Sequence, residues 1–314
     1  MALPLTPPIE PQLARGKPEL PVGDQWVYEP KYDGFRAIAF VDGHEVYLQS
    51  RGSRPLLRYF PELVFPAGRY VLDGEIVVAA GEGGEDFGAL QQRLHPAASR
   101  VAMLAEQTPA QYIAFDLLAL DDESILERPL AERRGLLEQL ALDGVALTPL
   151  VADVGEAEPW LRSGEGVVAK DSRAPYRPGA RTGMVKVKRL RTIDAVVLGY
   201  RPGKEEGTVG SLILGLYDAA GELRVVGHSS GLRAGEKRAL VERLAPYETG
   251  DRGHGDASRW QTEREMEWVA LRPELVVEVT FDHASGGRIR HGTKILRWRE
   301  DKAPRECLLE QMDA

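Results

Sequence analysis

Short runs of alternating hydrophobic and polar residues mark the first half of the chain. Residues 35–41 and 45–49 alternate in this way, and Asp42 and Gly43 stand between them. Asp-Gly between alternating runs predicts a β-hairpin. Residues 70–78 and 112–118 are apolar runs that predict two more strands, and residues 130–142 have the apolar spacing of an amphipathic surface helix.

The pattern changes after residue 190. Residues 194–200, 211–217, 223–228 and 274–282 predict short strands parted by glycine-rich turns, and residues 234–244 predict one helix. Several short strands with one helix are typical of an OB-type β-barrel. Because 314 residues exceed one typical compact core, we predict two domains of fold class α+β. Their expected bounds are residues 1–190 and 191–314, with a hinge at residues 190–193.

Lys31 lies between Glu29 and Arg36 and is a candidate covalent nucleophile. Lysine attacks only as a neutral amine, and its ordinary pKa is about 10.4. Burial and nearby cations disfavour the charged form. Arg36 is the expected cation, and the expected apolar surroundings are Val27, Phe35, Ile38 and Phe40. Taken alone, the segment fits a solvated lysine beside an Asp-Gly turn better.

Further segments follow Lys31 in a fixed order. They are Ser50–Gly52, Asp73–Glu75, an apolar strand around Phe115, Glu165–Lys170, Val185–Lys188 and Arg299–Lys302. Because side chains alternate along a strand, Asp73 and Glu75 are expected to share one face of their strand. For the same reason, Lys186 and Lys188 are expected to share one face of theirs.

In this order and at these separations, the segments resemble motifs I, Ia, III, IIIa, IV, V and VI of covalent nucleotidyltransferases, specifically ATP-dependent DNA ligases. The resemblance covers nearly the whole chain. The stretch 288–299 resembles small bacterial ligases of the C type and related end-joining ligases. One departure is Met184, where the family often has an aromatic residue; a thioether can pack similarly.

The resemblance implies an adenylation (nucleotidyltransferase) domain followed by an OB-fold domain, and an enzyme that seals nicks in duplex DNA. Lys31 would attack the α-phosphate of ATP and carry AMP. The AMP would pass to a 5′-phosphate at the nick, and the 3′-hydroxyl would then displace it. We expect a role in DNA repair, in a minimal ligase without a further DNA-encircling domain.

The resemblance also assigns residues to ATP and to Mg²⁺ or Mn²⁺. Glu165 and Glu75 would hold the metal. As an alternative, Glu75 would bind the ribose of ATP instead. Phe115 would stack on adenine. The full set expected to bind ATP is Glu29, Asp33, Arg36, Arg51, Glu75, Phe115, Arg181, Lys186, Lys188, Arg299, Asp301 and Lys302. Arg299, Asp301 and Lys302 would orient pyrophosphate when the barrel closes over ATP.

Other interpretations of these residues stay open. Alternating lysines also occur on exposed edge strands, an aromatic residue inside an apolar strand is usually core, and Arg181 also fits a solvated loop arginine. Glu75 and Glu165 taken singly also fit surface carboxylates. At the level of function, the alternatives are an RNA ligase, a GTP-using capping enzyme and a non-catalytic OB-fold adaptor.

The formal net charge of −8 does not exclude a DNA partner, because a local basic face binds phosphates. The expected basic stretches are Arg173, Arg177, Arg181, residues 186–191 and residues 288–305. Cys307 is the one cysteine, so there is no disulfide framework or cysteine zinc site. Because no apolar stretch has membrane-spanning length, we expect the protein in the bacterial cytoplasm, associated with the nucleoid. We also expect it to be a monomer. DNA-repair proteins are candidate partners.

Overall fold

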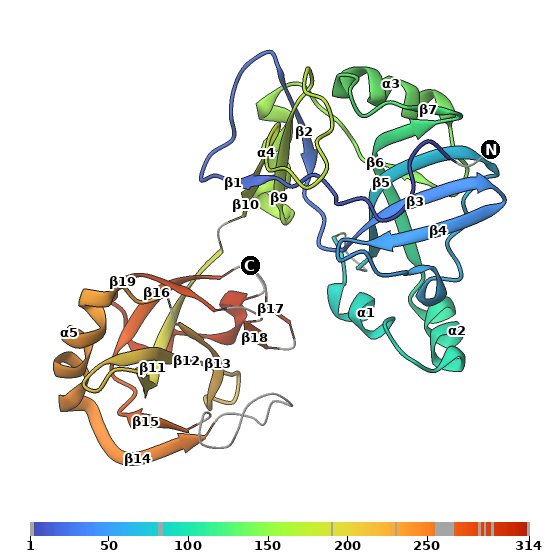
Figure 1. Ribbon diagram of the computed structural model, residues 1–314. Coiled ribbons are helices and arrows are strands. Elements are labelled where there is room, and N and C mark those ends of the chain that lie inside the picture. The colour runs from blue at the N-terminus through green and yellow to red at the C-terminus, as the bar shows by residue number, and fades with distance from the viewer. Residues whose placement is uncertain are drawn as a thin grey trace. The chain divides into compact units, whose positions relative to one another are not determined.

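The strands of the first half of the chain pair into two sheets (Figure 1). The larger sheet has the order β4–β3–β5–β6–β7, with β8 beside β6. Its strands are β3 (Phe35–Gly43), β4 (Glu45–Ser50), β5 (Gly68–Val78), β6 (Ala110–Leu120), β7 (Glu123–Ser124) and β8 (Ala146–Leu147). The smaller sheet has the order β1–β10–β9–β2, formed by β1 (Arg15–Gly16), β10 (Met184–Lys188), β9 (Gly166–Asp171) and β2 (Trp26–Pro30).

Alternation along β3 separates two hydrophobic cores. Ala37, Ala39 and Val41 face one core, which also contains Leu72 and Tyr112. Ile38 and Phe40 point to the opposite face, where they pack with Ile9, Val71 and Leu118. The central part of β3 is therefore buried on both faces of the sheet.

Short helices cover the sheets. The helices of the first half are α1 (Phe87–Gln92), α2 (Ala98–Gln107), α3 (Leu130–Leu140) and α4 (Val154–Ser163). α3 packs on β6, and α4 packs on β2 and β9. A single-turn 3₁₀ helix, η1 (Leu57–Tyr59), follows β4.

The second half of the chain forms a curled sheet around one core. The order is β13–β12–β11–β15–β14, and β16 pairs with both β11 and β19. Its strands are β11 (Arg191–Pro202), β12 (Val209–Tyr217), β13 (Leu223–Ser229), β14 (Glu248–His254), β15 (Glu267–Leu271), β16 (Val276–Phe281) and β19 (Lys294–Trp298). β17 (Ala284–Ser285) and β18 (Arg288–Ile289) form a separate two-stranded sheet. α5 (Ala234–Leu244) packs on β12, and the single-turn helices η2 (Ala245–Tyr247), η3 (Pro304–Glu306) and η4 (Leu309–Met312) complete the second half.

The two halves are separate compact units, Met1–Arg189 and Leu190–Ala314. This computed structural model describes residues 3–80, 84–189, 191–229, 231–254, 267–281, 284–285, 287–289 and 292–312. Within those residues, no helix is long and apolar enough to cross a membrane.

Several predicted elements are confirmed. The hairpin forms with Phe40 opposite Tyr47, and Gly43 has the positive φ of 65° that its turn requires. The predicted helices appear as α3 and α5. Residues 191–193 of the predicted hinge begin β11 and pair with β16. Leu190 lies outside the described residues, as does Asp282 at the end of the last predicted strand.

Candidate active site

A pocket of about 260 Å³ lies in the first unit and draws its lining from both sheets. Eight predicted residues line it: Glu29, Lys31, Asp33, Arg36, Arg51, Glu75, Phe115 and Lys186. Glu165, Arg181 and Lys188 belong to the same unit but do not line the pocket. Arg299, Asp301 and Lys302 belong to the second unit.

Lys31 follows directly after β2 and is fixed through its backbone. Its N–H donates to the carbonyl of Gly166, at 2.9 Å, and its Nζ lies 3.4 Å from the carbonyl oxygen of Tyr32. Gly166 has a φ of +130°, and a Cβ there would meet the carbonyl oxygen of Val187 at 2.2 Å. Glycine is therefore required at the point where β9 holds the backbone of Lys31 and passes close to β10.

The apolar surroundings predicted for Lys31 are wrong. None of Val27, Phe35, Ile38 and Phe40 lines the pocket within the described residues. Phe35 lies on the face of β3 opposite Arg36, and Ile38 and Phe40 lie farther along the strand in a separate core. The apolar lining comes instead from Leu13, Ala14, Phe115, Val168 and Met184.

Arg36 is anchored below the pocket by Asp73. Its Nε and Nη2 each donate to one Asp73 carboxylate oxygen at 2.6 Å, and Tyr176 donates its hydroxyl to the same carboxylate at 2.6 Å. The guanidinium carbon lies 4.3 Å from the centre of the Phe115 ring. Asp73 is fully buried and does not line the pocket, so this carboxylate orients Arg36 instead of facing a ligand.

A second buried ion pair lies beside Phe115. The Nζ of Lys170 is 2.7 Å from Glu29 Oε2, and both side chains are 5% exposed. The same ammonium lies 4.4 Å from the centre of the Phe115 ring. Burial raises the pKa of Glu29 despite the opposing effect of Lys170. Glu29 Oε1 has no hydrogen-bond partner among the residues that the structure describes, so one acceptor beside the pocket is unsatisfied there.

Cations converge at the side of the pocket formed by β10. The pKa of Lys186 is lowered by burial and then by the positive charges of Lys188, Lys31, Arg51 and Arg181. These four groups are therefore close enough to act on Lys186 electrostatically, including the two that do not line the pocket. Such a cluster provides fixed positive charge for an anionic ligand.

Carboxylates gather near Lys31 as well. Burial raises the pKa of Glu75 to about 7, against the opposing charges of Arg36 and Lys31. Burial also raises the pKa of Glu85, and the charges of Glu165 and Asp33 add to this effect. No group of three or more His, Cys, Asp or Glu side chains in the described part of the chain could hold a metal by itself.

In the second unit, Arg299 is held between two carboxylates. Its Nη1 donates to both oxygens of Asp194 at 2.8 and 2.9 Å, and its Nε and Nη2 donate to Asp301 at 2.9 Å. The bond from Arg299 lowers the pKa of Asp301 to about 2. Lys302 is half-buried next to this pair.

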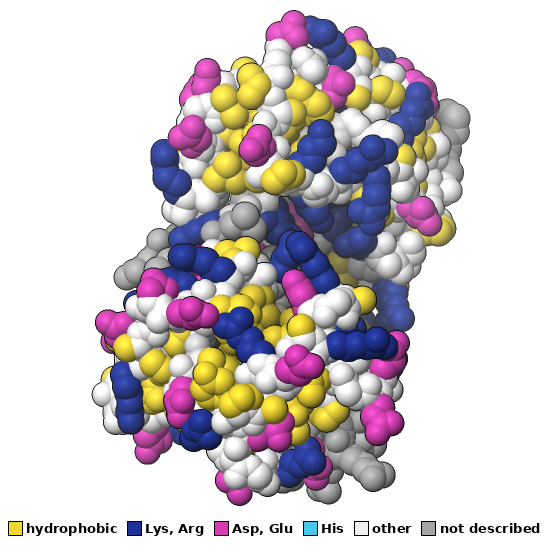
Figure 2. Space-filling view, turned by 90° about the vertical axis from the view of Figure 1, so that its left-hand side faces the viewer, with side chains coloured by type: hydrophobic (Ala, Val, Ile, Leu, Met, Phe, Trp, Pro, Cys, Tyr) yellow, Lys and Arg dark blue, Asp and Glu magenta, His cyan; other side chains and the backbone are white. Residues whose placement is uncertain are grey.

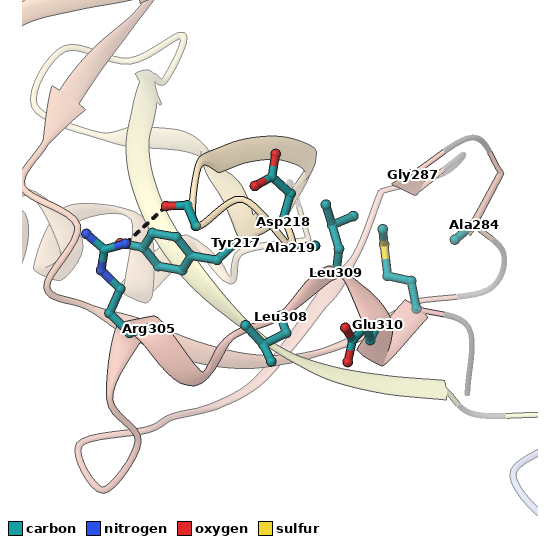
Figure 3. Close-up of a pocket in the computed structure, with 11 residues that line it drawn as sticks. Tyr217, Asp218, Ala219, Ala284, Gly287, Arg305, Leu308, Leu309 and Glu310 are labelled. Atoms are coloured by element: carbon teal, nitrogen blue, oxygen red, sulfur yellow. Dashed lines mark hydrogen bonds between the residues drawn. The ribbon is translucent and has the colours of Figure 1, made fainter.

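The second unit also contains a larger cavity, of about 660 Å³ (Figure 3). Tyr217, Arg305, Leu308 and Leu309 line it, and Arg305 donates to the Gly221 carbonyl at 3.0 Å. No predicted site residue lies among its described lining residues. Size alone therefore does not identify the site in this chain.

Comparison with known proteins decides the family. A profile described as "ATP dependent DNA ligase domain" matches residues 17–188. A second, "ATP dependent DNA ligase C terminal region", matches residues 205–302. The chain belongs to the ATP-dependent DNA ligases. It is thus an enzyme that forms phosphodiester bonds in DNA and uses ATP, and the resemblance found in its motifs is confirmed.

Individual relatives of the ligase agree over its full length. It is 44% identical to "DNA ligase C1" of Mycolicibacterium smegmatis over 336 residues, which cover 100% of this chain and 96% of the relative. It is 42% identical to "DNA ligase C" of Mycobacterium tuberculosis over 347 residues, covering 100% and 96%.

Among solved structures, the ligase is similar to "mycobacterial DNA ligase D complexed with ATP and MES". The TM-score is 0.53 at 30% identity, covering 96% of this chain and 98% of that one. A Lig E DNA ligase structure, at 22% identity and a TM-score of 0.57, shares the fold and covers 92% and 98%. The expected fold class, a nucleotidyltransferase domain followed by an OB-fold domain, is confirmed.

The ligase contains supporting residues that the sequence did not identify. Lys170 and Asp73 lie inside recognised motifs, but their partners Glu29 and Arg36 could not be assigned without the strand pairing. Asp194 was expected only as part of a strand. A charged residue in an otherwise apolar strand was the available signal, because it requires a partner when it is buried.

The basic stretches predicted in the ligase are only partly available to a ligand. Arg173 pairs with Asp24 at 2.7 Å, and Arg177 pairs with Glu127. Arg297 pairs with Glu278 at 2.6 Å. Figure 2 likewise shows acidic side chains interspersed with lysine and arginine on the visible face of the OB-fold unit. Paired arginines are less available to bind phosphate, so sequence clusters overstate the basic face.

Proposed function

We propose that this ligase seals nicks in duplex DNA through a covalent AMP on Lys31. The Nζ lone pair forms the bond to the α-phosphorus as the bond to pyrophosphate breaks, and the amine loses a proton. An oxygen of the 5′-phosphate at the nick then takes the AMP and frees Lys31. The oxygen of the 3′-hydroxyl attacks that 5′-phosphate, and AMP leaves.

The observation that carries this proposal is the position of Lys31 in a pocket with converging cations. Charge that develops on the transferring phosphate requires fixed positive groups. Lys186 and Arg51 line the pocket, and Lys188 and Arg181 act on Lys186 from nearby. We assign these four residues to the phosphates of ATP.

We assign Phe115 to the adenine ring, because its ring lines the pocket between two buried ion pairs. Glu29 would accept from the base. Arg36 has two donor groups taken up by Asp73, so it would touch ATP with its remaining nitrogen and position Phe115. Asp33, beside Lys31, would orient the ligand.

Mg²⁺ or Mn²⁺ fits the carboxylates near Lys31. Mg²⁺ prefers one or two carboxylates together with water and phosphate oxygens, so a cage of three acids is not needed. Glu75 and Glu165 would hold it, and Glu75 is also suited to the ribose. The raised pKa of Glu75 reflects a buried carboxylate that a cation would stabilise. The ion would neutralise charge on the phosphates.

We assign Arg299, Asp301 and Lys302 to the departing pyrophosphate. We further propose that residues 1–190 act as the adenylation domain and residues 191–314 as the OB-fold domain, and that the enzyme works as a monomer on nicked duplex DNA in repair. Its expected place is the bacterial cytoplasm at the nucleoid, where DNA-repair proteins are candidate partners. The relatives named DNA ligase C and DNA ligase D are the support for this setting.

Mass spectrometry tests the central step. The wild-type protein, incubated with ATP and magnesium, should gain one adenylate on Lys31, and the Lys31→Ala variant should gain none. Sealing of a nick should be lost in the same variant. An adenylate on another residue, or sealing without Lys31, would refute the assignment.

A further inference from the structure

Behind the Lys31 pocket, Arg36 belongs to a closed ring of hydrogen bonds. The backbone N–H of Gln12 donates to the hydroxyl oxygen of Tyr176 at 2.9 Å. That hydroxyl donates to Asp73 Oδ2 at 2.6 Å, and Asp73 also accepts from Nε and Nη2 of Arg36 at 2.6 Å. Arg36 Nη2 donates in addition to the backbone carbonyl of Gln12, at 3.4 Å. The ring therefore begins and ends at one residue of the N-terminal segment.

The direction of the bonds in this ring is fixed. A backbone N–H can only donate, so the Tyr176 oxygen accepts from Gln12 and its proton points to Asp73. Burial raises the pKa of Tyr176, and the charge of Asp73 raises it further, so the hydroxyl keeps its proton. Asp73 is fully buried, and Tyr176 is 2% exposed. Without this hydroxyl, Arg36 alone would hold the carboxylate of Asp73 among the described residues.

Gln12 is held in the ring by its own side chain. This side chain is buried, its Oε1 accepts from the N–H of Arg177 at 2.8 Å, and its Nε2 donates to the carbonyl of Thr182 at 2.6 Å. Both partners belong to residues 172–183, the segment that joins β9 to β10. The ring is thus tied to the segment that leads into the strand of Lys186.

The ring supports two walls of the ATP pocket. The guanidinium of Arg36 lies 4.3 Å from the centre of the Phe115 ring. Leu13 and Ala14, which follow Gln12, line the same pocket. Tyr176 is not among the described lining residues. Its hydroxyl can therefore affect ATP only through the residues that it holds in place.

We propose that Tyr176 is a positioning residue for adenylation, which holds Arg36 and the segment of Leu13 in the arrangement that binds ATP. The inference rests on the proposed function, because it takes Lys31 as the site of adenylation and Arg36 as a contact of ATP. Groups that are fixed before ATP arrives lose less conformational freedom when it binds. The hydroxyl takes no part in the exchange of bonds at phosphorus. Its loss should therefore weaken ATP binding and leave the chemical step nearly unchanged.

Adenylation of Lys31 at varied concentrations of radiolabelled ATP tests this role. Tyr176→Phe keeps the buried ring and removes only the hydroxyl. The ATP concentration that gives half the maximal rate should rise roughly tenfold, and the maximal rate should change by less than about twofold. An unchanged ATP concentration for half the maximal rate would overturn the proposal. So would a loss confined to the maximal rate.

Tyr70→Phe is the matched control for the loss of a buried hydroxyl. Tyr70 is also 2% exposed and donates at 2.6 Å, but its acceptor is the carbonyl of Pro66, and it does not line the pocket. Both tyrosine variants should melt at a lower temperature than wild type. Only Tyr176→Phe should change the dependence on ATP, and an equal change in the two variants would refute a positioning role.

Gln12→Ala tests the ring from its other side. It removes the two side-chain bonds that hold residue 12 and leaves Tyr176 and Asp73 in place. The ATP concentration for half the maximal rate should rise several-fold, and adding Tyr176→Phe should raise it little further, because both changes break one ring. An unchanged ATP dependence, or effects that multiply in the double variant, would contradict the inference. Absence of an adenylate on Lys31 in the wild type would refute the proposed function instead.

Discussion

Replacing Glu75 with glutamine should stabilise the first unit at alkaline pH and have little effect in acid. Burial raises the pKa of Glu75 from its ordinary value of 4.5 to about 7. A raised pKa means that the folded state binds the proton more tightly than the unfolded state does. Proton binding to Glu75 therefore contributes its full stabilisation below a pH of about 4.5, and this contribution is lost as the pH rises through about 7. Glutamine is neutral at every pH, so it avoids this loss.

The size of the effect follows from the two pKa values. They differ by about 2.5, and one unit corresponds to 1.36 kcal/mol, so ionised Glu75 costs the isolated fold at most about 3 kcal/mol. Partial contact with water lowers this figure. For a unit of this length, 1 kcal/mol shifts the melting temperature by roughly 2–4 °C. The variant should therefore melt several degrees above wild type at pH 8.

Thermal denaturation of both proteins without ATP or metal, at pH 5, 6, 7 and 8, measures the difference. The gap in melting temperature should open between pH 5 and pH 7. Adenylation should show the opposite trend: the variant should be slow at pH 8, where wild type uses the ionised carboxylate. A difference in melting temperature of equal size at every pH would refute the reasoning, because it would indicate an effect of packing and not of ionisation.

Two other substitutions follow from the ion pairs. Lys170→Ala should lower the free energy of unfolding, measured in urea, by about 3–5 kcal/mol, because it leaves Glu29 buried without its partner. The neutral double variant Glu29→Gln/Lys170→Met should recover most of that loss. Equal losses in the two variants would contradict an effect of charge. Arg299→Ala should slow adenylation of Lys31 by roughly 100-fold or more but largely spare sealing of a pre-adenylated nick. Radiolabelled ATP and an adenylated nick measure the two steps, and parallel loss of both would count against a role for Arg299 confined to pyrophosphate.

The sequence predicted what depends on neighbours along the chain. The hairpin of β3 and β4, the helices α3 and α5 and the common face of Lys186 and Lys188 follow from alternation and turn chemistry. The motif order also predicted half of the residues that line the pocket.

Contacts between distant segments could not be predicted in the same way. Lys170 meets Glu29 only because β9 pairs with β2, and Arg36 meets Asp73 only because β3 pairs with β5. The environment of Lys31 was wrongly predicted for a related reason. Phe35 and Ile38 are near Lys31 in sequence, but the strand directs each into a core away from the pocket.

Gly166 connects the main chain of Lys31 with the strand that carries Lys186. Its carbonyl holds the main chain of Lys31, and its lack of a side chain allows β10 to pass within van der Waals distance. The main chains of Lys31 and Lys186 are consequently joined through one sheet, so thermal motion of that sheet displaces both together. The spacing between the backbones of Lys31 and Lys186 therefore depends on the pairing of β2, β9 and β10.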